Sequence, residues 1–180
     1  MPLTTIFKPT NSDPFDFFGT SVSLQNTTLL VGAVGEDSSG QGLNRDMDKN
    51  DLRDSGAVYH FNLNASIDIW TENTFIKAND SQSDAVFGKY IALDESNIFI
   101  SSPLHNSNNF TNSGKTYSYR LTDESLNQTL QFQELGIADE MRFGSSLALY
   151  KETLIIGASG FVSQDSGLDS IFTGKIFTYE

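Results

Sequence analysis

Short apolar runs alternate with polar turns along this chain, in a pattern that predicts β-strands and no helices. One apolar run recurs three times, as Leu29–Ala33, Ile98–Ser102 and Leu154–Ala158. No segment shows a convincing apolar stripe with the 3.6-residue period of an amphipathic helix. The first and third runs show little alternation, which is typical of a strand that is covered on both faces. The pattern therefore predicts small sheets that stack face to face.

Each run lies inside a longer sequence unit that occurs three times. A Phe-Gly pair precedes each run, and a segment of the form Gly-x-x-aromatic-x-aromatic follows it. These motif residues are Phe18, Gly19 and Gly56 in the first unit, Phe87, Gly88 and Gly114 in the second, and Phe143, Gly144 and Gly174 in the third. We expect the paired aromatic residues to fill the space between neighbouring sheets. A fixed period of roughly 55 to 70 residues marks an architecture built from copies of one supersecondary unit.

We predict a single repeat domain over residues 1–180, with units at approximately 1–64, 65–122 and 123–180. Each unit is expected to contribute four strands and to begin with an outer strand. Glycine after phenylalanine suits a tight backbone corner where two chain segments approach closely. The domain is therefore expected to consist of three similar sheets in a row.

The second unit illustrates the strands that we expect. Trp70–Ala78 is predicted as an outer strand, and the next strand starts at Phe87 and continues to Leu93. Asp94–Asn97 consists of residues that favour turns, and the following strand runs through Asn97–Ser102. Leu121–Leu135 is the nearest candidate for a helix, but its end matches the strand pattern of the second unit. We therefore predict it as a strand.

Composition excludes several classes of partner and chemistry. The formal net charge is -12, which argues against nucleic acid and against anionic membrane surfaces, because both require basic patches. The chain has no cysteine, so it has no disulfides, thiolate metal sites or cysteine nucleophiles. No apolar run approaches the roughly 18 residues that a membrane-spanning helix needs, and no signal peptide pattern opens the sequence. We expect no nucleic-acid partner and no membrane insertion.

The wording of the repeat resembles a known family. Phe18–Leu24, Leu29–Ala33 and Gly56–Phe61 are similar to the FG-GAP repeat, the blade unit of integrin α-subunit β-propellers and of many bacterial surface and secreted proteins. The loop that starts at Gly35 and the strand that starts at Trp70 resemble the bacterial form, and the likeness covers essentially the whole chain in three copies. It implies an all-β fold, a partial β-propeller of three four-stranded antiparallel blades.

The resemblance also implies a function. It indicates a non-catalytic module for extracellular or cell-surface interaction with a protein or glycan ligand, of an adhesion-like kind. Two alternatives stay open: an accessory propeller portion of a larger secreted enzyme, or purely structural blades of a larger surface protein. We expect no enzymatic activity, since His60 alternates with aromatic residues in a strand and His105 has no evident carboxylate beside it. The sequence has neither a nucleophile elbow nor a phosphate-binding glycine loop.

Closed propellers have roughly four to eight blades, and three are too few. Leu3–Lys8 is expected to be an outer strand without a preceding unit, and Lys175–Tyr179 is expected to lack an outer partner. In a complete ring these two strands would pair. The chain is therefore either a piece of a longer propeller or half of a homodimer that completes the ring. We favour the first alternative, because repeat arrays need terminal caps and none is visible.

The longest loop, Val34–Ser55, is the leading candidate for a contact surface. Asp46, Asp48 and Asn50 have the alternate spacing that lets oxygen ligands converge on one calcium ion, and Asp54 is a further candidate ligand. The EF-hand pattern fails, because Asp51 stands where its glycine belongs. The loop is either stabilised by calcium or is a solvated acidic loop whose charge is offset by nearby basic residues.

The other loops give weaker indications of metal binding. Family members often carry a calcium loop between the first two strands of a blade, but the connections here are too short and too poor in carboxylates for such a cage. Asp165 and Asp169 in the third unit's loop are interpreted as solvated. We expect no cofactor apart from this one candidate calcium loop.

Overall fold

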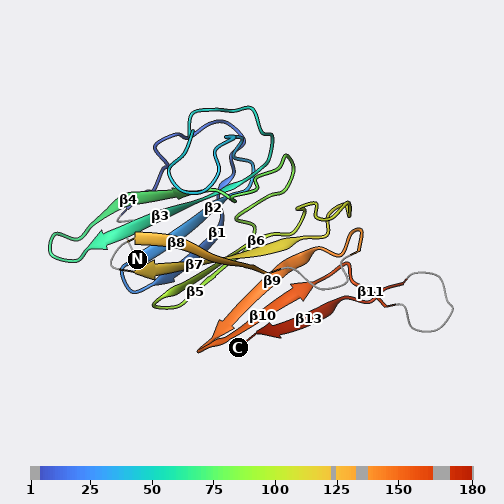
Figure 1. The fold of residues 1–180 in the computed structure, drawn as a ribbon. Helices are drawn as coiled ribbons and strands as arrows, with labels where there is room; N and C mark the ends of the chain where they lie inside the picture. Colours follow the sequence, from blue (N-terminus) through green and yellow to red (C-terminus); the bar gives the residue numbers. More distant parts are fainter. Residues whose placement is uncertain (1–4, 123–124, 133–137, 164–170, 180) are drawn as a thin grey trace.

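The computed structural model describes residues 5–122, 125–132, 138–163 and 171–179, which contain β-strands and no helix (Figure 1). Accordingly, nothing in these ranges is a helix long and apolar enough to cross a membrane. The strands form two four-stranded sheets, one three-stranded sheet and one two-stranded ribbon. The sheets do not close into a ring. The predicted all-β class and the partial propeller arrangement are confirmed.

The first sheet is a complete antiparallel blade. Its strands follow the order β1-β2-β3-β4 and consist of β1 (Phe18–Gln25), β2 (Thr28–Ala33), β3 (Ala57–Asn64) and β4 (Ile69–Ile76). Every residue of β2 is buried, as expected for an apolar run covered on both faces. The outer strand predicted from Trp70 onwards is β4, and it pairs with β3.

The second sheet has the same order of strands. It consists of β5 (Ile91–Leu93), β6 (Asn97–Ser102), β7 (Lys115–Thr122) and β8 (Ser125–Phe132). The turn predicted at Asp94 is confirmed, because its Oδ1 accepts hydrogen bonds from the amides of Ser96 and Asn97 at 2.8 and 2.7 Å. Of the predicted strand Leu121–Leu135, residues 121–122 are the end of β7 and residues 125–132 form β8, while residues 123–124 and 133–135 lie outside the described ranges.

The prediction that a strand starts at Phe87 is wrong, since β5 begins only at Ile91. Gly88 has a φ of 89°, which turns the backbone out of the extended conformation. The amide of Phe87 donates to the carbonyl of Ser55, just before the third strand of the first sheet, at 3.0 Å. The Phe-Gly pair of this unit therefore serves as a link between sheets.

The third sheet has three strands in the described residues. They are β9 (Phe143–Tyr150), β10 (Thr153–Ala158) and β13 (Lys175–Tyr179), with β10 in the centre. The ribbon consists of β11 (Val162–Ser163) and β12 (Ile171–Phe172). As predicted for Lys175–Tyr179, β13 lies at a sheet edge without an outer partner among the described strands.

The N-terminal outer strand predicted at Leu3–Lys8 is not found. Leu3 and Thr4 lie outside the described residues, and residues 5–8 are not in a strand. Phe7 instead packs edge-on against Phe61 and Trp70, with ring centroids 5.4 and 5.9 Å apart. Aromatic packing, and not a ladder of backbone hydrogen bonds, holds this segment to the first sheet.

The sheets lie next to one another in chain order (Figure 1). Two hydrophobic clusters fill the spaces between them. Tyr117 and Tyr119 contribute to the cluster between the first and second sheets. Phe177 and Tyr179 pack on the cluster between the second and third sheets. These two aromatic pairs fill inter-sheet space as predicted. Tyr59 of the first pair instead packs with Phe18 and Phe75 in a third cluster on the sheet's other side.

Backbone hydrogen bonds join the first two sheets at one corner. The amides of Asp84, Val86 and Phe87 donate to the carbonyls of residues 53, 54 and 55 at 2.7, 3.0 and 3.0 Å. A Cβ atom on Gly56 would overlap the backbone of Phe87. Glycine is therefore required at this position by the close approach of the two sheets.

The same joint recurs between the second and third sheets. The amides of Glu140, Arg142 and Phe143 donate to the carbonyls of residues 111, 112 and 113 at 2.8, 2.9 and 2.9 Å. A Cβ atom on Gly114 would overlap Phe143 just as one on Gly56 would overlap Phe87. The repeated motif thus specifies a repeated contact between neighbouring sheets.

Candidate functional site

The long loop Val34–Ser55 connects β2 to β3 and has a buried root. At the root, Lys77 Nζ lies 2.8 Å from Glu36 Oε2 and donates to Ser55 Oγ at 2.6 Å. Both charged side chains are almost completely buried. Burial lowers the pKa of Lys77, and the neighbouring carboxylate of Glu36 opposes that shift. The root therefore fixes both ends of the loop to the segment that follows β4.

The tip of this loop is exposed, and its predicted metal ligands have separate surroundings. Asp46 pairs with Lys49 at 3.3 Å, and the Asn50 amide nitrogen donates to Asp13 at 2.6 Å. Asp48 is exposed, and Asp54 is half-buried. Within the described part of the chain, no three acidic or histidine side chains group in a way that could hold a metal ion. Calcium binding by the loop stays a prediction, and Asp165 and Asp169 lie outside the described residues.

A second polar cluster lies in the second unit, around Asp80. Its carboxylate accepts a hydrogen bond from Tyr117 at 2.7 Å and lies 2.5 Å from Lys115 Nζ and 3.3 Å from His105 Nε2. Partial burial acts to raise the pKa of Asp80, but the hydrogen bonds from these three side chains outweigh it and lower the pKa. The cluster links the loop after β6 to the segment after β4.

Sequence reasoning missed the contact between His105 and Asp80. The residues are 25 positions apart in the chain, so neither predicts the other by local spacing. The repeat offered a signal, because Asn11 and Asp80 each stand seven residues before a Phe-Gly phenylalanine. Asn11 Oδ1 accepts a hydrogen bond from Tyr59 at 2.8 Å, just as Asp80 accepts one from Tyr117. Aligning the units would have placed Asp80 beside the third strand of its own sheet.

Ser107, His105 and Asp80 have the side-chain types of a hydrolase triad. Ser107 Oγ lies 3.1 Å from His105 Nδ1, on the other side of the ring from Asp80. A triad needs a nucleophile that a substrate can reach and a buried carboxylate that orients the histidine. Here the burial is reversed, since Ser107 is buried and Asp80 is only half-buried. The arrangement suits a structural link between two loops.

His60 lies in β3 and is completely buried. Burial lowers the pKa of its imidazole, because removing the ring from water disfavours the charged form. This environment agrees with the predicted structural role.

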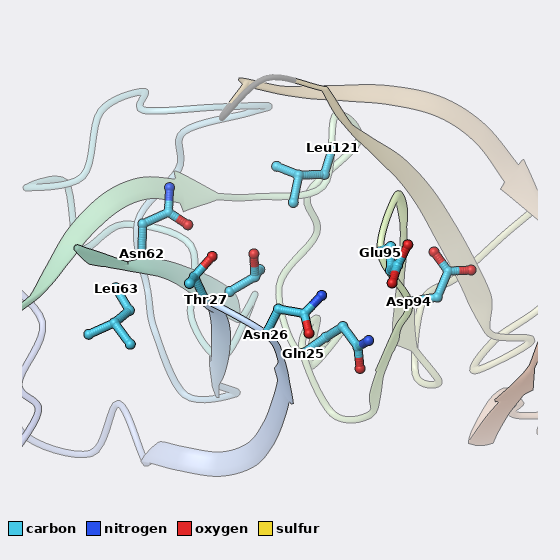
Figure 2. Close-up of a pocket in the computed structure, with 9 residues that line it drawn as sticks. Gln25, Asn26, Thr27, Asn62, Leu63, Asp94, Glu95 and Leu121 are labelled. Atoms are coloured by element: carbon cyan, nitrogen blue, oxygen red, sulfur yellow. The ribbon is translucent and has the colours of Figure 1, made fainter. Parts of the chain in front are cut away.

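A polar hollow of about 250 Å³ lies at the opposite edge of the first two sheets. Figure 2 shows Asn26 and Asn62 on one side of it and Asp94 and Glu95 on the other. The carboxylate of Asp94 accepts hydrogen bonds within its own turn. These hydrogen bonds outweigh the effect of burial and lower the pKa of Asp94. The lining comes from four separate segments, so the sequence alone gave no indication of it. Its side chains suit a ligand that forms hydrogen bonds.

Comparison with protein-family models matches residues 6–61 to the FG-GAP repeat. The matched range contains β1, β2, the long loop and most of β3. This finding confirms the resemblance that was inferred from the repeat motif. No curated protein matches the chain.

Proposed function

Because this chain carries an FG-GAP repeat at residues 6–61, we propose that it is a non-catalytic interaction module acting outside the cell or at its surface. The loop Val34–Ser55 is its main contact surface, and the ligand is a protein or a glycan. The observation that carries the proposal is the division of this loop into a buried root and an exposed tip. Glu36 and Ser38 are buried, whereas residues 44–46 and 48–51 are exposed.

A rooted loop has a physical advantage in binding. Ordering a mobile loop opposes association, so a loop that is already fixed binds more tightly for the same contacts. The ion pair of Lys77 with Glu36 fixes the root, and the amide of Asn44 donates to the carbonyl of Phe75 at 2.9 Å. The tip can therefore present its side chains without a large loss of conformational entropy.

The charges of the tip favour a partner that is not strongly charged. Arg45 and Lys49 offset two of the three carboxylates of the tip, those of Asp46, Asp48 and Asp51, which leaves the tip close to neutral. Balanced charges provide hydrogen-bonding specificity and little long-range attraction. A neutral glycan or a mixed polar protein surface fits this tip better than a polyanion does.

The loop of the second unit extends the same surface. Gln82 and Asn106 exchange two hydrogen bonds of 3.0 Å, which tie the loop after β6 to the segment after β4. The Asp80 cluster ties the same two segments. Both loops leave the carboxyl ends of second strands, so they lie at one edge of the stacked sheets. His105 within this cluster is buried, which supports a structural and non-catalytic role.

The test uses labelled full-length chain on an array of glycans and an array of purified extracellular-matrix proteins. Binding to at least one feature is expected. The variant Arg45→Ala/Asp48→Ala/Asp51→Ala should reduce that binding at least about tenfold, the effect of losing about 1.4 kcal/mol. The matched control Thr27→Ala/Glu95→Ala changes the opposite edge and should bind like the wild type.

Both variants should keep the wild-type melting temperature, because the substituted side chains lie on the surface. Absence of binding to every feature would contradict the proposal. Equal binding by the tip variant and the wild type would move the contact surface away from this loop and would favour purely structural blades.

A further inference from the structure

The outer face of the third sheet carries a hollow of about 330 Å³. Its lining includes Ser146 of β9, Gly157 of β10, Lys175 and Ile176 of β13, and Gly174 just before β13. Ile176 is 69% exposed. In the described residues no other strand covers this face. The hollow is therefore an open part of a sheet whose other face packs on the second sheet.

The same positions of the first sheet form a filled hollow. Ser21 and Gly32 correspond to Ser146 and Gly157, and each pair is matched across the two strands in the same register. Ser21 Oγ donates to the carbonyl of Gly88 at 2.6 Å. A Cβ atom on Gly32 would overlap that carbonyl. The hollow of the first sheet thus receives the Phe-Gly corner of the next unit.

The first unit carries a Phe-Gly corner that no sheet of the described residues receives. Phe15, Phe17 and Gly19 have φ angles of 74°, 55° and 97°. The corner that joins the first two sheets, at residues 84, 86 and 88, has φ angles of 62°, 52° and 89°. A Cβ atom on Gly19 would have no described atom within 4 Å. The free corner therefore already has the backbone conformation of a corner that is bound in a joint between sheets.

The apolar side chains around the free corner are exposed as well. Val22 and Leu24 of β1 are 62% and 60% exposed. The residues at the same positions of β9, Leu147 and Leu149, pack on the cluster between the second and third sheets. The free corner and the open hollow are thus the two halves of a joint that the chain forms twice within itself.

We propose that two copies of this chain associate head to tail through these halves. The corner Phe17–Gly19 of each copy enters the hollow formed by Ser146, Gly157, Gly174 and Ile176 of the other. The occupant is a second copy because one chain carries both halves, in the geometry of its internal joints. Two equal head-to-tail contacts between two copies form a closed assembly. This surface is separate from the loop edge, so the inference does not depend on the proposed function.

The first measurement is the molar mass of the full chain by light scattering behind size exclusion. A pair has twice the chain mass of 19.8 kDa. Ile176→Asp and Val22→Asp each place a charge in one half of the joint and should return the mass to that of one chain. Ile67→Asp is the matched control, since Ile67 lies in the β3–β4 turn and is 62% exposed. The control should stay paired.

Mixing the two single variants tests the direction of the contact. A head-to-tail pair of one Ile176→Asp chain with one Val22→Asp chain keeps one intact joint, so the mixture should regain part of the paired mass. Circular dichroism spectra like that of the wild type would show that both variants fold. A wild-type mass of 19.8 kDa at all concentrations would overturn the proposal and leave both faces to a further blade. Pairing that survives Ile176→Asp would overturn the head-to-tail geometry.

Discussion

The first and third sheets present the same backbone motif to very different surroundings. Val58 in β3 and Ile176 in β13 occupy the same register, opposite Gly32 and Gly157. Val58 is 0% exposed, whereas Ile176 is 69% exposed. The second sheet covers the first of these residues, and no described strand covers the other. A repeat motif therefore specifies the shape of a joint, while the stability gained from it depends on whether a neighbour is present.

Two lysines at equivalent positions of the repeat show the same difference between a covered and an uncovered site. Lys77 and Lys8 each stand ten residues before the phenylalanine of a Phe-Gly pair. Lys77 is buried against Glu36 at the boundary of two sheets, and Lys8 is exposed. Burial makes a charge dependent on its partner, because an unpaired buried charge is strongly destabilising.

The largest effect is expected from Lys77→Met. This change leaves the carboxylate of Glu36 buried without its partner and should lower the free energy of unfolding by about 3–5 kcal/mol. Lys8→Met, the matched control, should change it by less than about 0.5 kcal/mol. Urea titration followed by circular dichroism measures both. Equal losses in the Lys77→Met and Lys8→Met variants would contradict the contrast between the two lysines. The double variant Lys77→Met/Glu36→Gln should recover part of the stability that Lys77→Met loses.

A slightly smaller effect is expected at the motif glycines. Gly56 and Gly174 both have a positive φ, of 81° and 67°. Alanine at either position costs about 1–2 kcal/mol of backbone strain. At Gly56 the new Cβ atom also overlaps Phe87, whereas at Gly174 the nearest atom would lie 3.7 Å away. Gly56→Ala should therefore cost about 2–4 kcal/mol in total, and similar melting temperatures for the two variants would contradict this view of the joint.

The next largest loss of stability is expected when a covered side chain is shortened to alanine, and it is compared with the same change at an uncovered one. Val58→Ala removes two buried methyl groups and should cost about 2 kcal/mol, including the cavity that it leaves. Ile176→Ala should cost less than about 0.5 kcal/mol when unfolding is measured at a concentration where the chain is single. A raised concentration that makes Ile176→Ala costly would sharpen the comparison, because it would show that a second copy covers this face.

The smallest effect is a dependence on pH in the first sheet. Burial lowers the pKa of His60 in the folded state, so below the ordinary histidine pKa of about 6.5 the unfolded state binds more protons. Stability should therefore fall as the pH drops below about 6.5, by at most about 1 kcal/mol in the first unit of pH. His60→Phe should remove this loss.

Thr178→His is the matched control for that titration. Thr178 is exposed in β13 at the position that corresponds to His60. An exposed imidazole is solvated in both states and should add no such dependence on pH. Thermal melts between pH 5.5 and 7.5 compare the variants. If the stability of His60→Phe falls with decreasing pH as steeply as that of the wild type, another group causes the effect.

The sequence predicted the fold well where the pattern is local. The apolar run of β2, the turn at Asp94 and the outer strand at Trp70 each follow from neighbouring residues. The sequence also placed β13 at an edge, because the repeat shows which strand lacks a partner. These features depend on alternation, turn chemistry and repeat register, which the chain carries within each unit.

Prediction failed where a distant segment decides the conformation. The strand expected from Phe87 is replaced by a corner, since the amide of Phe87 donates to the carbonyl of Ser55, which precedes a strand of another sheet. The segment around Phe7 was expected to be an outer strand from its place in the repeat, but aromatic packing positions it. The link between His105 and Asp80 joins two loops of one unit, and no spacing rule connects them. Tertiary contacts override local preference at each of these positions.

The two joints between sheets are formed by main-chain atoms, and this has a consequence for engineering. Their hydrogen bonds have nearly the same lengths, although the preceding loops, residues 34–55 and 103–113, differ in length by a factor of two. Sheet spacing is thus independent of what the loops contain. A foreign peptide grafted between Asp48 and Asn50 should be displayed on an unchanged stack of sheets, which makes the chain a scaffold for presenting new epitopes.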